Sequence, residues 1–233
     1  MDPMSRIRLT ALACALAACA ALATPAQASN TQELGAPHGL AFPAADCPTD
    51  CQAIAQVTGF NVRLNGVHNP MRIRRSGYIV AFTVKLSKPD PNETTFFDAK
   101  YGSPSTARLA IVRSEHHADQ YKLINQTQAF DLRPYFGSTP TIALRKPFRV
   151  HKDDIVALTV PHWLPAFSHN LDNQEIWRAS HVESDCAATD PPAAPHEQVD
   201  TDKTYACDYK AARLLYTASF IGDPTPTNTA KIR

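Results

Sequence analysis

The sequence has few glycines, and no phosphate-binding loop can be built from them. Only 8 of its 233 residues are glycine, and neither the Walker nor the dinucleotide-binding glycine spacing occurs. No G-x-S-x-G pentapeptide marks a serine nucleophile on a strand-to-helix turn. We therefore find no motif for nucleotide binding or nucleophilic catalysis. Glycosidase-type carboxylate pairs stay open, because such partners meet only in the folded chain.

The chain also lacks a surplus of charge and a long apolar segment beyond its N-terminus. Of 23 basic and 22 acidic side chains, removal of residues 1–28 takes Arg6, Arg8 and Asp2 and leaves 21 of each. A nucleic-acid-binding protein needs excess cation to neutralise phosphates, so no nucleic-acid partner is predicted. No later segment approaches the ~20 apolar residues of a spanning helix, so we expect no transmembrane segment in the mature chain.

What the sequence does contain begins with a segment typical of a secretory signal peptide, residues 1–28. A short basic region precedes an apolar run from Leu9 to Leu22, and Ala26-Gln27-Ala28 supplies the small residues of a cleavage site. An alternative stays open, because Leu16-Ala17-Ala18-Cys19 fits a bacterial lipobox in which Cys19 is lipidated. We expect a secreted protein or, alternatively, a lipoprotein anchored to a membrane through Cys19.

Four cysteines follow the signal peptide: Cys47, Cys51, Cys186 and Cys207. An even number in an exported chain predicts disulfide bonds. Four cysteines allow three pairings, and proximity favours Cys47–Cys51 and Cys186–Cys207. The second bridge closes a loop of about 20 residues and would contribute roughly 3 kcal/mol to stability. Only the first pair is close in sequence, whereas a zinc site needs two close pairs, so no metal site is predicted.

Alternating apolar and polar residues predict a chain made mainly of β-strands. The clearest case places Tyr78, Val80, Phe82, Val84 and Leu86 on one face of an extended segment. Further strands are expected at 108–113, 121–127, 141–144, 148–150, 155–160, 204–209 and 213–221. Apart from a weak helical pattern near 52–57, no helical periodicity follows the signal peptide. These patterns predict an all-β fold, an antiparallel β-sandwich of jelly-roll-like form with long loops.

The expected domain organisation is simple. Residues 29–45 mix Gly, Pro, Ala and polar residues and are interpreted as a flexible lead-in. Residues 46–221 form the sandwich domain, and residues 222–233 are expected to be a disordered tail. Two segments without strand patterns, 87–106 and 161–203, are predicted as long loops, where a functional site is most often found.

The second of these loops carries the candidate ligand-binding residues Trp163, Phe167 and Trp177. Exposed aromatic rings stack on sugar faces and anchor protein interfaces. The alternative interpretation is that Trp163 and Trp177 pin their loop onto the sandwich. Exposure of the rings decides between the two.

The histidines do not form a recognisable site. Glu115-His116-His117-Ala118-Asp119 is interpreted as a solvated turn, since adjacent side chains of an extended chain point in opposite directions. His162, His169 and His181 follow the spacings H-x6-H and H-x11-H, which match no ligand motif. We therefore predict no catalytic residue, no metal and no cofactor.

Several segments carry a resemblance. Residues 146–161, with a charged turn before Asp154-Ile155-Val156-Ala157-Leu158, resemble a hairpin of uncharacterised secreted β-sandwich proteins of actinobacteria. Residues 69–82 and 105–112 are similar to the preceding strands of such proteins, and residues 205–216 to their ending. The resemblance covers roughly residues 50–221; it implies the sandwich fold and no activity.

Together these observations predict a secreted or cell-surface, non-catalytic β-sandwich that binds a glycan or another cell-envelope component. Two alternatives stay open. One is an extracellular hydrolase with a site in the 161–183 loop, and the other is a purely structural envelope protein.

Overall fold

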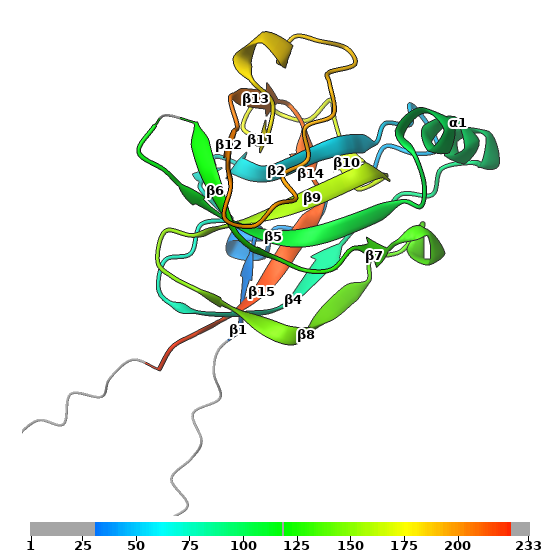
Figure 1. Ribbon diagram of the computed structural model, residues 1–233. Coiled ribbons are helices and arrows are strands. Elements are labelled where there is room, and N and C mark those ends of the chain that lie inside the picture. Colours follow the sequence, from blue (N-terminus) through cyan, green and yellow to red (C-terminus); the bar gives the residue numbers. More distant parts are fainter. Residues whose placement is uncertain (1–30, 118, 225–233) are drawn as a thin grey trace, which may run out of the picture.

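A computed structural model describes residues 31–117 and 119–224 (Figure 1). The strands are β1 Thr31–Leu34, β2 Ile54–Leu64, β3 Val67–His68, β4 Gly77–Val84, β5 Thr106–Ser114, β6 Gln120–Gln126, β7 Phe130–Asp131, β8 Thr141–Val150, β9 Ile155–Leu164, β10 Phe167–Ser168, β11 Ile176–Ala179, β12 Asp202–Thr204, β13 Cys207–Lys210, β14 Arg213–Leu214 and β15 Tyr216–Gly222. One α-helix, α1 Pro91–Tyr101, and the 3-10 turns η1 Pro37–Gly39, η2 Arg133–Tyr135 and η3 Glu183–Asp185 complete the elements. The predicted signal peptide and Cys19 lie outside the described residues, as does most of the predicted tail.

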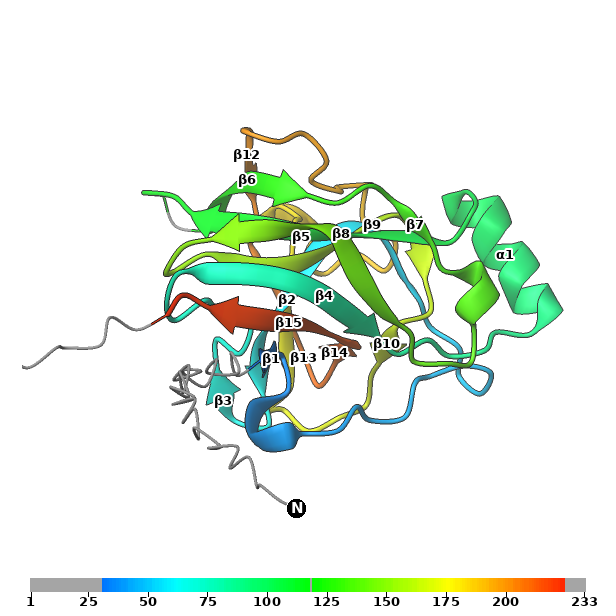
Figure 2. The ribbon, with the colours of Figure 1, turned by 90° about the horizontal axis from the view of Figure 1, so that it is seen from below.

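The strands form two large sheets and one two-stranded sheet, β10-β14, all with antiparallel ladders. The smaller sheet has the order β1-β15-β4-β8, and the larger one runs β12-β6-β5-β9-β2-β11-β13, with β3 and β7 attached at its sides. Figure 1 places the smaller sheet below the larger one, and Figure 2 views the molecule from that side. Apolar side chains of both sheets meet in one core. The predicted all-β antiparallel sandwich is confirmed.

Strand β4 differs from the predicted alternation because it contains a β-bulge. The register of β4 shifts between Ile79 and Ala81 in its ladders with both β8 and β15. A bulge inserts one residue and moves the following side chains to the opposite face. Ile79 is therefore buried beside Phe82, whereas Tyr78, predicted on the Phe82 face, is exposed.

The predicted loop 87–106 is wrong over its centre, which forms α1. Asp90 caps this helix by accepting hydrogen bonds from the backbone N–H groups of Asn92 and Glu93, and the Glu93 carboxylate accepts one from the backbone of Asp90. This capping box, with Pro91 in the first turn, starts the helix without an apolar stripe. The helical pattern near 52–57 is also wrong, because β2 begins there.

Two other segments predicted as irregular contain strands. In the predicted lead-in 29–45, β1 pairs with β15, so the sandwich begins earlier than residue 46. In the predicted loop 161–203, β9 continues to Leu164, and β10, β11 and β12 follow. Aromatic and polar residues do not alternate regularly in these segments, so the sequence pattern did not predict the strands. Packing against neighbouring strands, rather than local alternation, decides their structure.

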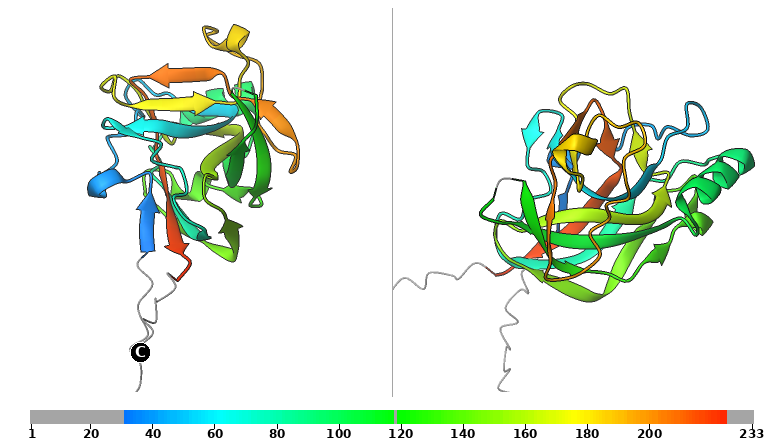
Figure 3. Two further views of the ribbon diagram at one scale, coloured as in Figure 1. Left: turned by 90° about the vertical axis from the view of Figure 1, so that its left-hand side faces the viewer. Right: turned by 45° about the horizontal axis from the view of Figure 1, so that its top comes forward.

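Both predicted disulfides are confirmed: Cys47 is bonded to Cys51, and Cys186 to Cys207. The second joins the residue that follows η3 to β13. In the left view of Figure 3, β13, β11 and β2 lie side by side, and the segment around η3 projects beyond them. Neither α1 nor any 3-10 turn of the described ranges is long and apolar enough to cross a membrane.

Candidate ligand-binding cavity

A cavity of about 350 Å³ opens beside β2, β11 and β13. Its buried lining residues are Ile54, Val57, Phe167, Trp177, His181 and Ala212. Its exposed rim includes Gln52, Thr189, Asp190 and Lys210. Small-molecule sites begin at about 300 Å³ and combine apolar walls with a few polar groups, so the cavity has the size and character of such a site.

The cavity begins at a bulge in β2. The register between β2 and β9 shifts between Ala55 and Val57, and Gln56 adopts a φ of 49° in the left-handed region. Bulges bend a strand and redirect its side chains, and they are frequent beside functional sites. The Gln56 carbonyl accepts a hydrogen bond from the N–H of Ala194 (2.8 Å), and its amide donates to the Tyr101 carbonyl (3.4 Å). The bulge therefore ties β2 to both α1 and the segment 187–195.

Aromatic rings form one wall of the cavity. Trp177 and Tyr209 are cross-strand neighbours on β11 and β13, and their rings stack with centroids 4.9 Å apart and planes at 27°. Phe167 meets Trp177 edge-to-face at 6.0 Å. Gly59 on β2 makes room for the indole, since a Cβ there would lie 2.8 Å from Trp177 Cε3. Because Gly59 has no side chain, the indole of Trp177 can pack directly against β2.

The three predicted aromatic residues separate into two environments. Trp163 is fully buried in the core, where it packs on Phe97 and donates its indole N–H to Asp98 Oδ1 at 2.9 Å. Phe167 and Trp177 line the cavity, but they are only 9% and 7% exposed. The predicted single loop is wrong, because the three residues lie on β9, β10 and β11, and all three rings are buried. Trp163 therefore anchors its segment to the sandwich, as the alternative interpretation states, whereas Phe167 and Trp177 line the cavity.

The buried part of the cavity wall contains polar atoms without partners. His181 is 4% exposed, and its Nδ1 has no hydrogen-bond partner among the described residues. The same holds for Nε1 of Trp177. Burial lowers the pKa of His181, and the nearby Asp185 offsets this only in part, so the imidazole is neutral at neutral pH. A buried unsatisfied polar atom costs roughly 1–3 kcal/mol, which calls for a reason such as a ligand.

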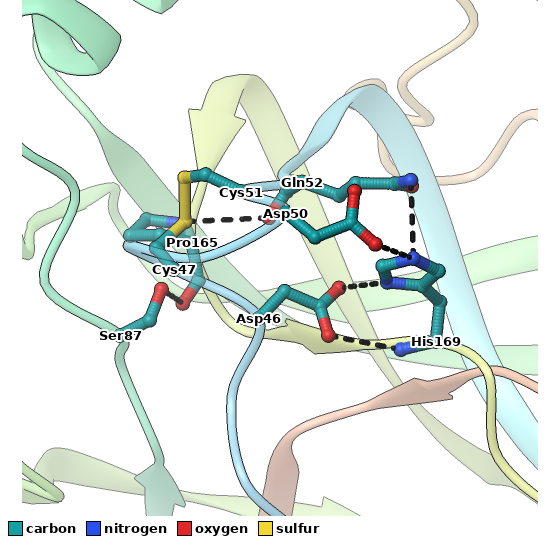
Figure 4. A network of polar contacts seen from close by, with 8 residues as sticks. All are labelled: Asp46, Cys47, Asp50, Cys51, Gln52, Ser87, Pro165 and His169. Carbon is teal, nitrogen blue, oxygen red and sulfur yellow. Dashed lines mark hydrogen bonds and ion pairs between the residues drawn. A yellow bond between two sulfur atoms is a disulfide. The ribbon is translucent and has the colours of Figure 1, made fainter.

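At the rim, His169 is held between two carboxylates (Figure 4). Its Nδ1 lies 2.6 Å from Asp46 Oδ2, and its Nε2 lies 2.9 Å from Asp50 Oδ2. Burial opposes the charged ring, but the hydrogen bonds and charges of the two aspartates outweigh burial and raise the pKa of His169. In the charged form both nitrogens donate. His169 then has no free nitrogen with which to accept a proton from a substrate.

A segment from the Cys186–Cys207 loop also borders the cavity. Asp190 lies 3.2 Å from Lys100 Nζ and 3.4 Å from the Tyr101 hydroxyl, both at the end of α1. Ala188, Thr189 and Pro191 of the same segment line the cavity. The disulfide and the contact with α1 thus hold this border at its two ends.

The other histidines noted in the sequence lie elsewhere. His162 bonds through Nδ1 to the Pro104 carbonyl, and His116 and His117 are exposed in the turn between β5 and β6. Within the described ranges, the residues close enough to share a metal ion are Cys47, Cys51 and Glu93. The two sulfurs are bonded to each other, which removes them as metal ligands.

Sequence reasoning singled out Phe167 and Trp177 but missed Gln56, Asp46, Tyr209 and the role of His181. The aspartate beside the Cys47–Cys51 pair was a local signal, whereas its partner His169 is 123 residues away. No protein-family model, curated protein or solved structure matches the chain. The resemblance to secreted actinobacterial proteins stays a prediction.

Proposed function

We propose that the protein is an exported, non-catalytic binding module that holds a saccharide unit of the cell envelope in the cavity beside β2, β11 and β13. The observation that carries this proposal is the aromatic wall with unsatisfied polar atoms. Trp177 stacks on Tyr209, while Trp177 Nε1 and His181 Nδ1 lack partners among the described residues.

The buried wall of the cavity favours an uncharged ligand, although the exposed rim carries the cation Lys210. His169 is compensated by Asp46 and Asp50, and Asp190 is paired with Lys100. The neutral His181 adds no charge to the buried wall of the cavity. An ionised ligand group bound against the buried wall would lose its hydration and would meet no opposite charge among the described residues of that wall. Burial of such an unpaired charge is unfavourable.

The mixture of side chains suits a sugar. Sugar hydroxyls both donate and accept hydrogen bonds, as do the amides of Gln52 and Gln56 and the hydroxyl of Thr189 at the cavity border. The apolar faces of a sugar ring pack against aromatic rings. Tyr209 is half-buried, so its ring is available to a ligand at the mouth of the cavity.

Export supports an envelope ligand. The N-terminal segment 1–28 has the sequence of a signal peptide. Two disulfides suit an oxidising compartment outside the cytoplasm. Lipidation of Cys19 is the alternative to free secretion, and labelling of producing cells with a fatty-acid analogue separates the two, because only the lipoprotein takes up the label.

The hydrolase alternative has less support. Two of the three histidines of segment 161–183 are engaged by other groups, since His162 bonds to Pro104 and His169 to Asp46 and Asp50. His181 is neutral, but hydrolysis of a glycoside requires two carboxyl groups flanking the bond. In the described part of the cavity lining the one carboxylate is Asp190, which is paired with Lys100.

Co-sedimentation of the purified protein with insoluble polysaccharides tests the proposal; peptidoglycan sacculi, chitin and cellulose are suitable. Tyr209→Ala, in the cavity wall, should reduce the bound fraction several-fold, consistent with the loss of one stacking aromatic ring. Phe96→Ala and Tyr135→Ala are matched controls, because these rings are 57% and 47% exposed and do not line the cavity.

Three outcomes contradict the proposal. Loss of binding in the control variants with retention in Tyr209→Ala would place the site outside the cavity. Absence of binding to all three polysaccharides would favour the structural envelope protein. Release of soluble sugar from the sedimented material would favour the hydrolase.

A further inference from the structure

We propose that His181 makes the cavity selective for N-acetylated sugars, with the acetamido group of the sugar bound at the buried wall. This inference rests on the proposed saccharide binding and names the sugar class. The decisive feature is a neutral imidazole placed among apolar side chains. His181 lines the same cavity as Ile54, Val57 and Trp177, all of them buried.

The wall needs a ligand group that is both apolar and polar. A sugar that carries only hydroxyl groups would place them against Ile54, Val57 and Phe167, where few of their hydrogen bonds could be satisfied. An acetamido group combines a methyl group, which packs on such side chains, with an amide that needs a polar partner. His181 Nδ1 and the indole N–H of Trp177 are polar groups of this wall that lack a partner among the described residues.

The hydrogen-bond inventories match. A neutral imidazole has one N–H donor and one bare nitrogen acceptor, and an amide has one N–H donor and one carbonyl acceptor. The indole N–H is a donor only, so it also requires an acceptor such as a carbonyl oxygen. Either tautomer of His181 therefore finds a complementary atom on the amide.

A small side-chain movement redirects the sealed nitrogen of His181. His181 Nδ1 and Trp177 Nε1 are sealed from solvent, and neither has a hydrogen-bond partner among the described residues. A half-turn of the imidazole about its Cβ–Cγ bond exchanges Nδ1 with Cδ2 at nearly constant shape. Such a turn places the nitrogen on the other side of the ring without displacing β11 or its neighbours.

Charge separates the acetamido group from the free amine. Removal of the acetyl group leaves an ammonium, which is unfavourable in a buried wall without an unpaired carboxylate. His169 lies at the rim and is already bonded to Asp46 and Asp50, so these carboxylates are engaged. The cavity therefore favours the acetylated form over both the hydroxyl and the amine.

Titration calorimetry with matched trisaccharides tests the inference. Chitotriose, cellotriose and the deacetylated trimer of glucosamine share one backbone and differ only in the group at the second carbon. We expect chitotriose to bind roughly ten-fold more tightly than cellotriose, consistent with one hydrogen bond and one buried methyl group. The deacetylated trimer should bind more weakly than chitotriose as well.

Substitution of His181 assigns the selectivity. His181→Leu keeps a similar volume but has no polar atom, and it should lower the preference for chitotriose to less than about three-fold. His181→Gln retains a neutral donor and acceptor and should restore part of the preference. His116→Leu, in the exposed turn between β5 and β6, is the control and should leave the preference unchanged. Thermal unfolding of each variant establishes that it is folded.

The outcomes distinguish this inference from the proposed function. Equal affinities for chitotriose and cellotriose would overturn the role of the acetamido group while leaving saccharide binding intact. An unchanged preference in folded His181→Leu would overturn the role of His181. No binding of any of the trisaccharides, together with no sedimentation on polysaccharides, would overturn both. If His181→Leu does not fold, the Gln variant carries the same test, because loss of all preference there contradicts hydrogen bonding by a neutral amide.

Discussion

The Nδ1 atom of His169 lies 2.6 Å from Oδ2 of Asp46, although the two residues are 123 positions apart in the sequence. The backbone N–H of His169 also donates to Oδ1 of the same carboxylate. These two hydrogen bonds fasten the segment of the Cys47–Cys51 disulfide to the residues after β10 (Figure 4). The contact has a consequence for stability because the ring is titratable.

We predict that His169 stabilises the fold most strongly at low pH. Its pKa is raised in the folded protein, so the folded state binds the proton more tightly than the unfolded chain does. This stabilisation is fully present below a pH of about 6.5 and is lost as the pH rises through the folded-state pKa. The free energy of unfolding of His169→Gln should therefore fall furthest below wild type at pH 5 and approach it at pH 9.

Urea denaturation across this pH range measures the difference. His116→Gln, in an exposed turn, is the control and should follow the wild-type curve at every pH. A destabilisation by His169→Gln that is the same at pH 5 and pH 9 would contradict a charged ring between the aspartates.

His196 should act in the opposite direction. It is buried, with Nδ1 3.1 Å from the Tyr205 hydroxyl and Nε2 3.0 Å from the Thr201 carbonyl. Burial lowers its pKa, so the unfolded chain takes up a proton that the folded state resists. Stability from this group is therefore lost as the pH falls below about 6.5.

We expect His196→Gln to lose less stability than the wild type between pH 6.5 and pH 5. At neutral pH the variant should be less stable, because the imidazole hydrogen bonds to Tyr205 and Thr201 are replaced. Thermal melts at closely spaced pH values measure this. A variant curve parallel to wild type through the acid limb would refute the assignment to His196.

Trp163 should behave as a core residue and not as a ligand contact. Its indole packs on Phe97 and Phe136, and its N–H is bonded to Asp98, which also pairs with Arg133. Replacement of a buried tryptophan by alanine costs about 3–5 kcal/mol. Trp163→Phe, which keeps a ring and loses one hydrogen bond, should cost about 1–2 kcal/mol.

Chemical denaturation gives both values, and saccharide affinity should be unchanged in folded Trp163→Phe. A loss of affinity without a loss of stability would return Trp163 to the binding site and contradict its position in the core.

The two disulfides should contribute unequally. In the chain-entropy description, the Cys186–Cys207 bridge, with a sequence separation of 21, contributes roughly 3 kcal/mol, and the short Cys47–Cys51 bridge roughly 2 kcal/mol. Cys186→Ser combined with Cys207→Ser should also weaken saccharide binding, because the loop it closes supplies Thr189 and Asp190 to the cavity. Denaturation and calorimetry of the two double variants test this, and greater stability loss from the shorter bridge would contradict it.

The sequence was informative wherever local alternation decided the structure. Val156, Leu158 and Val160 alternate with less apolar neighbours, and β9 forms there as expected. Proximity along the chain sufficed for the disulfides. Local alternation could not predict the bulge in β4, because Ile79 and Val80 are both apolar. Only the pairing of β4 with β8 and β15 shows which of the two side chains faces the core.

The cavity was only partly predictable for a related reason. Trp163 and Trp177 look alike in the sequence, but Trp177 lies opposite β2 near Gly59, whereas Trp163 faces the helix α1. Strand register over long sequence separations decides that difference. The capping box at Asp90 and Glu93 is a local sequence signal for the start of α1. The adjacent residues Phe96 and Phe97, however, do not follow the spacing of an apolar helix face, so the helix was not predicted.

The central claim is that the cavity beside Trp177 binds a sugar, and the chain offers a direct reporter because it has only two tryptophans. Trp163→Phe leaves Trp177 as the single emitter in the cavity wall, and Trp177→Phe leaves Trp163 in the core. Titration of both variants with chitotriose should change the fluorescence of Trp177, saturably and at the calorimetric affinity, while Trp163 emission stays constant. A saturable change of Trp163 alone, or unchanged Trp177 emission while calorimetry registers binding, would contradict the claim.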